Sequence, residues 1–177
     1  MIFLARHGET TWNVAGRYQG RLESPLSPLG VRQSEALARH LADAAASGGP
    51  APQRTISSPL LRCTATAEKT ATLLAIPCST DERLIEIAHG TWEDRARDEI
   101  EKNDPARYRA WRRNPARVTF EGGESLAAVL ERWRAFAPEL RKAGNVLVVT
   151  HDAVIRCALV DLLGLTLDDF WKVKVSK

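Results

Sequence analysis

The chain has few cysteines, and Cys63, Cys78 and Cys157 are odd in number and lie far apart. No two of them form the Cys-x-x-Cys pair that is typical of metal ligands. We therefore expect three reduced thiols in a cytoplasmic protein, because disulfides persist mainly in oxidising compartments.

Long hydrophobic runs and an excess of charge of one sign are lacking too. No apolar stretch approaches the roughly 18 residues that span a membrane, and no basic segment precedes the apolar N-terminus as in a signal peptide. The 25 Lys+Arg and 22 Asp+Glu residues leave a net charge of only +3, which does not indicate nucleic-acid binding. We expect neither a membrane nor a nucleic acid among the partners.

The composition is otherwise that of an ordinary globular protein, with 44% hydrophobic and 27% charged residues. A chain of 177 residues can bury a sizeable core. No internal repeat is visible, so we expect a single domain over residues 1–177. The sequence leaves the oligomeric state open, a homodimer included.

Short apolar runs alternate with segments of helical periodicity, and this order predicts helices on both faces of a mostly parallel sheet. The expected strands cover residues 1–5, 54–58, 77–80 and 146–150, and residues 173–175 alternate like the start of another. The expected helices cover residues 28–46, a segment that starts within residues 59–62 and runs to about residue 74, a long segment after Ser125, and residues 152–163.

Two of these helical segments carry more specific expectations. The helix at 28–46 should begin with Ser27 as its N-cap and bury a stripe of Leu29, Gln33, Ala36, Leu37 and Leu41. Residues 98–113 are rich in charge and form a helical excursion interrupted near Pro105. We call this excursion, near residues 95–120, the cap, and expect it to lie over the mouth of the site.

Titratable side chains follow the expected strands at their carboxyl ends, where α/β folds place their ligands. Arg6 and His7 follow the first strand, Arg62 begins the helix after the second, and His151 follows the fourth. Two histidines and two arginines at strand ends suit a phosphate, because guanidinium groups match phosphate oxygens.

Four motifs, in this order, resemble the histidine phosphatase superfamily, the phosphoglycerate mutase-like family. They are Arg6-His7-Gly8, the stretch Ser57–Ala67 with Arg62, the segment Leu84–Asp94 with Glu86, and His151–Arg156. The resemblance covers nearly the whole chain and implies a three-layer α/β/α sandwich with a mostly parallel, mixed central sheet. It makes His7 the nucleophile and Glu86 the proton donor.

The resemblance implies a metal-independent phosphatase that hydrolyses a small phosphomonoester through phosphohistidine, without a cofactor. The expected catalytic residues are His7, Glu86, Arg6, Arg62 and His151. The expected substrate-binding residues are Arg6, His7, Asn13, Gln19, Gly20, Arg62 and His151. In this scheme the arginines and His151 hold the phosphoryl oxygens while Glu86 protonates the leaving group.

Three alternatives stay open from the sequence. A metal could be held by His7, His151 and Glu86, although the two adjacent arginines would repel a cation. A cofactor-dependent phosphoglycerate mutase is the second alternative, and the shortness of this chain favours the phosphatase over it. The third is a catalytically silent module that binds a phosphorylated ligand.

The sequence departs from the family pattern at three places. Asp152 and Asp94 stand where the family usually has glycine, and we expect Asp152 to point away from the site and favour the dipole of the following helix. Family members usually continue for another hairpin, so the chain is expected to be truncated or unusually short. The natural substrate stays open among sugar phosphates, phosphoglycerates, nucleotide phosphates and a cobalamin precursor phosphate.

Overall fold

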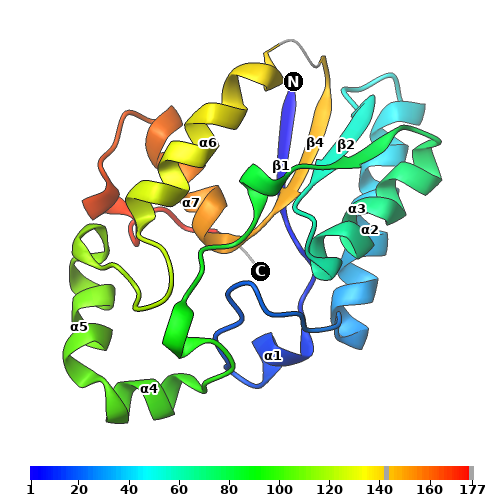
Figure 1. The fold of residues 1–177 in the computed structure, drawn as a ribbon. Coiled ribbons are helices and arrows are strands. Elements are labelled where there is room, and N and C mark those ends of the chain that lie inside the picture. Colours follow the sequence, from blue (N-terminus) through cyan, green and yellow to red (C-terminus); the bar gives the residue numbers. More distant parts are fainter. Residues whose placement is uncertain (142–143, 176–177) are drawn as a thin grey trace.

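A sheet of parallel strands runs through the computed structural model, which describes residues 1–141 and 144–175 (Figure 1). The strands are β1 (Ile2–Arg6), β2 (Arg54–Ser57), β3 (Cys78–Thr80) and β4 (Val146–Thr150). They lie in the order β1-β4-β2-β3, and each neighbouring pair is parallel. The expected mixed sheet therefore contains no antiparallel strand in the part of the chain that the structure describes.

The helices match the expected alternation with strands. They are α1 (Thr11–Val14), α2 (Pro28–Ala46), α3 (Leu61–Leu74), α4 (Arg97–Asn103), α5 (Pro105–Arg113), α6 (Leu126–Leu140) and α7 (Asp152–Leu162). Four 3₁₀ turns join them: η1 (Glu82–Leu84), η2 (Gly90–Trp92), η3 (Pro115–Arg117) and η4 (Leu167–Asp169). No helix among the described residues combines the length and the apolar character needed to cross a membrane.

The strand β4 lies inside the sheet, and all five of its residues are buried. Val146 and Val148 join the core cluster that contains the apolar faces of α6 and α7. Leu147 and Val149 pack on the opposite face, in the cluster with Leu41 of α2 and residues of α3. Figure 1 shows these two helix pairs on either side of the sheet. The predicted three-layer α/β/α architecture is confirmed.

The helix α2 begins as predicted, because Ser27 caps it by accepting a hydrogen bond from the Gly30 N–H at 3.0 Å. Its predicted core stripe is partly wrong, since Leu29 is 42% exposed and Ala36 is exposed as well. The residues buried on α2 are Gly30, Ser34, Ala38 and Leu41. Glycine occupies position 30 on this face because the backbone after β1 passes so close that a Cβ there would lie 1.9 Å from the Glu9 carbonyl oxygen.

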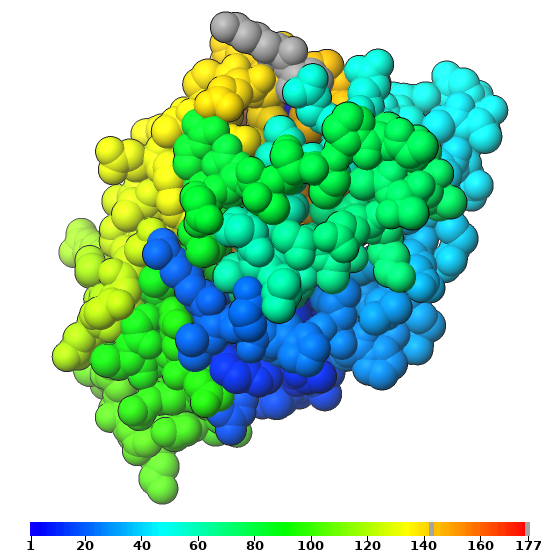
Figure 2. Space-filling model, turned by 45° about the vertical axis from the view of Figure 1, so that its right-hand side comes forward, coloured from blue at the N-terminus to red at the C-terminus, as the bar shows by residue number. Residues whose placement is uncertain are grey.

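The cap contains the two expected helices, α4 and α5, with the break at Pro105. Its buried aromatic side chains, Tyr108 and Trp111, belong to the same core cluster as Trp92 and Phe170. The polar loop after α1 (residues 15–26) packs beside the cap, where the Arg97 N–H donates to the Gly16 carbonyl. Figure 2 shows this loop, in blue, at the surface next to the green cap segment.

The expected strand at residues 173–175 is wrong. The chain there has no strand pairing, and the Arg156 side chain donates to the carbonyl oxygens of Phe170 and Val173. The Trp171 indole N–H donates to the Trp111 carbonyl at 2.7 Å. Side-chain contacts thus hold this segment, which we call the C-terminal segment (residues 170–175), against α5 and α7.

The buried face of α2 yields a prediction about stability. Gly30→Ala should lower the free energy of unfolding by about 1–3 kcal/mol, because its new methyl group overlaps the Glu9 carbonyl. Leu29→Ala should cost less than about 1 kcal/mol because Leu29 is largely exposed, whereas a buried leucine would cost about 2–5 kcal/mol. Urea unfolding of both variants measures the difference, and a larger cost for Leu29→Ala would contradict the observed face.

Candidate active site

His7 follows β1 directly and is held by the neighbouring strand, since its backbone N–H donates to the Thr150 carbonyl at 3.0 Å. The ring is 7% exposed, and Nδ1 lies 2.7 Å from the Gly8 carbonyl oxygen. A carbonyl can only accept a hydrogen bond, so Nδ1 carries the proton and Nε2 keeps its lone pair. Burial, together with the positive charges of Arg62 and Arg6, lowers the pKa of His7 to about 3. The imidazole is therefore neutral at pH 7.

The turn after His7 requires glycine. The Gly8 N–H donates to Thr66 Oγ1 at 3.0 Å, and a Cβ on Gly8 would lie 2.5 Å from the Gly30 carbonyl oxygen. The start of α2 and the start of α3 thereby fix the direction in which the chain leaves His7.

Arg62 enters the site from the first turn of α3 and is 1% exposed. Its guanidinium donates to the carbonyl oxygens of Leu22 at 2.8 Å and Gly20 at 2.7 Å, both in the polar loop. Its Nε has no hydrogen-bond partner among the described residues. Burial lowers the pKa of Arg62. The side chain therefore anchors the loop and brings positive charge to His7.

Glu86 lies in the segment after η1 and is almost fully buried. One carboxylate oxygen accepts a hydrogen bond from the Ile87 N–H at 2.9 Å. Burial raises the pKa of Glu86 to about 7, and the negative charge of Asp152 acts in the same direction. A carboxyl group with this pKa can both give and take a proton near neutral pH.

His151 occupies the N-cap position of α7 without a side-chain capping hydrogen bond, and it is fully buried. Its Nε2 lies 2.8 Å from Ser58 Oγ and 3.4 Å from the Cys63 sulfur. Its ring meets the ring of His7 edge-on, with the centroids 5.2 Å apart. Burial and the charge of Arg62 lower its pKa well below the ordinary value. His151 therefore packs behind His7, and its role as a direct ligand of phosphate stays a prediction.

A cavity of about 480 Å³ lies at the carboxyl ends of the strands. Its wall includes all of the predicted site residues except His151: Arg6, His7, Asn13, Gln19, Gly20, Arg62 and Glu86. Asn13 Oδ1 accepts from the Thr10 N–H at 3.0 Å, and Gln19 Oε1 accepts from Thr10 Oγ1 at 2.9 Å. Their amide oxygens are thus occupied, and their NH₂ groups remain as donors for an anion.

The structure adds residues that the sequence reasoning missed. Four further arginines line the same cavity: Arg17, Arg97, Arg112 and Arg156. His89 lines it too, three residues after Glu86, and its ring packs on Tyr18 and Phe120. Burial lowers the pKa of His89 to about 3, and its Nδ1 has no hydrogen-bond partner among the described residues. The spacing Glu86-x-x-His89 was the one visible signal for it.

The expectation that Asp152 points away from the site is wrong. Asp152 lines the cavity, and its carboxylate pairs with Arg6 at 3.4 Å and with Arg156 at 2.7 Å. Its side chain is the first of α7, but it takes its hydrogen bonds from these two guanidinium groups.

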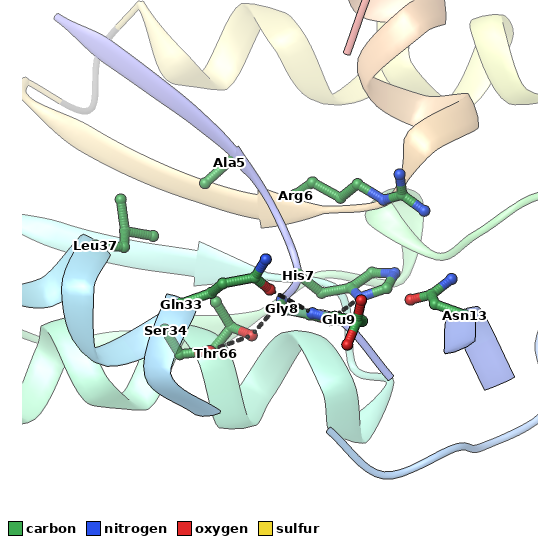
Figure 3. A pocket seen from close by; sticks show the side chains of 10 residues that line it. All are labelled: Ala5, Arg6, His7, Gly8, Glu9, Asn13, Gln33, Ser34, Leu37 and Thr66. Atoms are coloured by element: carbon green, nitrogen blue, oxygen red, sulfur yellow. Dashed lines mark hydrogen bonds between the residues drawn. The ribbon is translucent and has the colours of Figure 1, made fainter. Parts of the chain in front are cut away.

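A second, smaller cavity of about 280 Å³ adjoins the site on the side of α2 (Figure 3). It shares Arg6, His7 and Asn13 with the larger cavity, and its other walls include Leu37, Gln33 and Glu9. It lacks both Arg62 and Glu86. The larger cavity, which holds six arginines against Glu86 and Asp152, is therefore the better place for an anionic phosphoryl group.

The alternative of a metal held by His7, His151 and Glu86 finds no support in their placement. Within residues 1–141 and 144–175, no three His, Cys, Asp or Glu side chains are grouped so that they could hold a metal ion.

Comparison with known proteins agrees with this geometry. The sequence pattern of the histidine phosphatase superfamily (branch 1) matches residues 2–177. Phosphoserine phosphatase 1 of Hydrogenobacter thermophilus is 37% identical over 173 residues, which cover 96% of this chain and 79% of that protein. The probable phosphoglycerate mutase GpmB of Proteus mirabilis is 34% identical over 171 residues, covering 93% and 75% of the two chains.

A solved structure, YhfR of Bacillus stearothermophilus, superposes with a TM-score of 0.89 at 31% identity and covers 98% of this chain and 84% of its own. The predicted family, fold and enzyme class, a histidine-type phosphomonoesterase, are thereby confirmed. The chain belongs to the histidine phosphatase superfamily.

Proposed function

We propose that this protein hydrolyses a small phosphomonoester through a phosphohistidine intermediate on His7. The observation that carries the proposal is one cavity in which a neutral imidazole lies beside two arginines and a carboxyl group with a pKa near 7. The relative named phosphoserine phosphatase 1 supports phosphatase activity.

The proposed site draws on residues from Arg6 to Val175, so we also propose that the whole chain acts as one domain. The cytoplasmic location stays a prediction.

The proposed reaction has two steps. His7 Nε2 attacks phosphorus, the bond to the leaving oxygen breaks, and Glu86 gives its proton to that oxygen. Arg6 and Arg62 stabilise the charge on the phosphoryl oxygens. In the second step the Glu86 carboxylate takes a proton from a water molecule while the water oxygen attacks phosphorus. The bond between phosphorus and His7 Nε2 breaks, which releases phosphate and restores neutral His7 and protonated Glu86. The guanidinium groups supply the positive charge, so the proposal requires neither a metal nor a cofactor.

We further propose that the leaving group carries a second anionic group. Arg97 and Arg112 line the cavity from the two helices of the cap, and neither forms an ion pair with a described carboxylate. Arg112 is instead stacked on Trp171, with 4.7 Å between its guanidinium carbon and the ring centroid. Two such guanidinium groups suit a carboxylate or a second phosphate.

The nucleophile is tested by His7→Ala. Turnover of an aryl phosphate with chelator present should fall by at least about 10³-fold, because the proposed intermediate forms on His7. His40→Ala is the matched control, since His40 is exposed on α2. Mass spectrometry of acid-sensitive phosphate on His7 tests the intermediate directly. Equal turnover in wild type and His7→Ala would overturn the proposal.

The proton donor is tested by Glu86→Gln. With alkyl phosphates, whose leaving groups are poor, kcat should fall by about 10²–10⁴-fold, and with activated aryl phosphates by much less. In the wild type kcat should fall as the pH rises through the pKa of Glu86, about 7, because the acid form is the active one. In Glu86→Gln, kcat should no longer fall over this pH range. Equal losses for good and poor leaving groups would contradict the assignment.

The second anionic group is tested by a matched pair of substrates, O-phosphoserine and O-phosphoethanolamine, which differ by one carboxylate. Arg97→Met or Arg112→Met should lower kcat/KM for phosphoserine by about tenfold and leave phosphoethanolamine nearly unchanged. Arg109→Met is the control, since Arg109 is exposed on α5 and does not line the cavity. Equal effects on both substrates would exclude this role.

Adding 3-phosphoglycerate with its bisphosphorylated primer tests for the mutase activity that the similarity to GpmB suggests.

A further inference from the structure

The carboxylate of Asp152 is shared between two arginines that reach it from different elements. Arg6 from the end of β1 approaches Oδ1 at 3.4 Å. Arg156 from the next turn of α7 donates to Oδ2 at 2.7 Å and to Oδ1 at 3.3 Å. The side chains of Arg6 and Asp152 are 20% and 23% exposed, so solvent screens their attraction only in part.

Arg156 extends this connection to the C-terminal segment. It donates to the carbonyl oxygens of Phe170 and Val173, and its guanidinium lies over the rings of Phe170 and Trp171 at 5.6 Å and 5.2 Å. Phe170, Trp171 and Val175 line the catalytic cavity. One continuous set of contacts therefore joins a wall of the cavity to the arginine that precedes the nucleophile.

We propose that Asp152 is a positioning residue that holds the Arg6 guanidinium at the cavity and couples it, through Arg156, to the C-terminal segment. The inference rests on the proposed phosphatase function. An arginine side chain has many rotamers, and ordering it before the substrate arrives removes part of the entropy cost of binding. Arg6 spends one N–H group on Asp152 and keeps its others for phosphate oxygens.

The opposite effect of Asp152 would be repulsion of the phosphate, since both are negative. Two guanidinium groups bind this single carboxylate, so its charge is compensated locally. We therefore expect that ordering the Arg6 side chain strengthens phosphate binding more than the repulsion by Asp152 weakens it. The two effects change phosphate affinity in opposite directions when the charge is removed.

Asp152 also acts on the proton donor. The charged groups that influence Glu86 come from three elements: Asp152 on α7, Arg62 on α3 and Arg6 at the end of β1. His7 and His89 beside them are neutral at pH 7. The negative charge of Asp152 raises the pKa of Glu86, whereas both arginines lower it. Removing the charge of Asp152 should therefore lower the pKa of the Glu86 carboxyl group.

The first test compares Asp152→Asn with Asp161→Asn, a control on the same helix whose carboxylate pairs with Arg134 at 2.7 Å outside the cavity. Calorimetric titration with inorganic phosphate measures binding without turnover, so it is valid even if the phosphatase proposal fails. Asp152→Asn should weaken phosphate binding by about fivefold. It should also lower the pH at which kcat begins to fall on the alkaline side. Asp161→Asn should change neither. Unchanged or tighter phosphate binding in Asp152→Asn would overturn the proposal.

The second test uses Arg156→Met, alone and combined with Asp152→Asn. Arg156 lies one turn after the start of α7, so the single variant leaves Asp152 at the helix N-terminus unchanged. If the contacts form one unit, the double variant should lose less phosphate affinity than the product of the two single losses. The coupling through Arg156 would be excluded if the double variant lost phosphate affinity by the full product of the two single losses. It would also be excluded if Arg156→Met lost no phosphate affinity. Thermal unfolding of each variant confirms that the binding data come from folded protein.

Discussion

The pairing of β1 with β4 is the contact on which the site depends. The two strands come from opposite ends of the chain, and their parallel register places Arg6 beside Thr150. One residue further on, the His7 and His151 rings meet, and Arg6 reaches Asp152. A register shift of one residue would turn every side chain of β1 to the other face of the sheet. The pairing of β1 with β4 therefore positions His7, the proposed nucleophile, through backbone hydrogen bonds.

Burial then sets the charge of His7 and of Glu86, the two groups proposed to react. Removal from water disfavours whichever form is charged, so it lowers the pKa of His7 to about 3 and raises that of Glu86 to about 7. A neutral imidazole at His7 and a carboxyl group at Glu86 that keeps its proton up to near neutral pH thus result from the same cause. The buried charge of Arg62 is tolerated because two loop carbonyls accept its hydrogen bonds, and those bonds also fix the loop that carries Gln19 and Gly20.

The sequence predicted the four observed strands and the main helices because these depend on local patterns, and most of the proposed site residues line one cavity. A β-branched run such as residues 146–150 requires cover on both faces, and a strand followed by Arg6 and His7 indicates a ligand site in an α/β fold. The errors have tertiary causes. The core face of α2 is rotated because Gly8 and Glu9 pack on Gly30, and residues 173–175 form no strand because Arg156 binds the backbone there.

The sequence by itself determined the family, the order of strands and helices, and the titratable groups at the strand ends. These follow from hydrophobic periodicity and from motifs whose residues lie within a few positions of one another. Only the tertiary structure decided the charge states of these groups, the place of His151 behind His7 and the pairing of Asp152 with Arg6 and Arg156. The tertiary structure also decided that Arg97 and Arg112 of the cap line the cavity. Burial and proximity depend on contacts between distant segments, and no local pattern encodes such contacts.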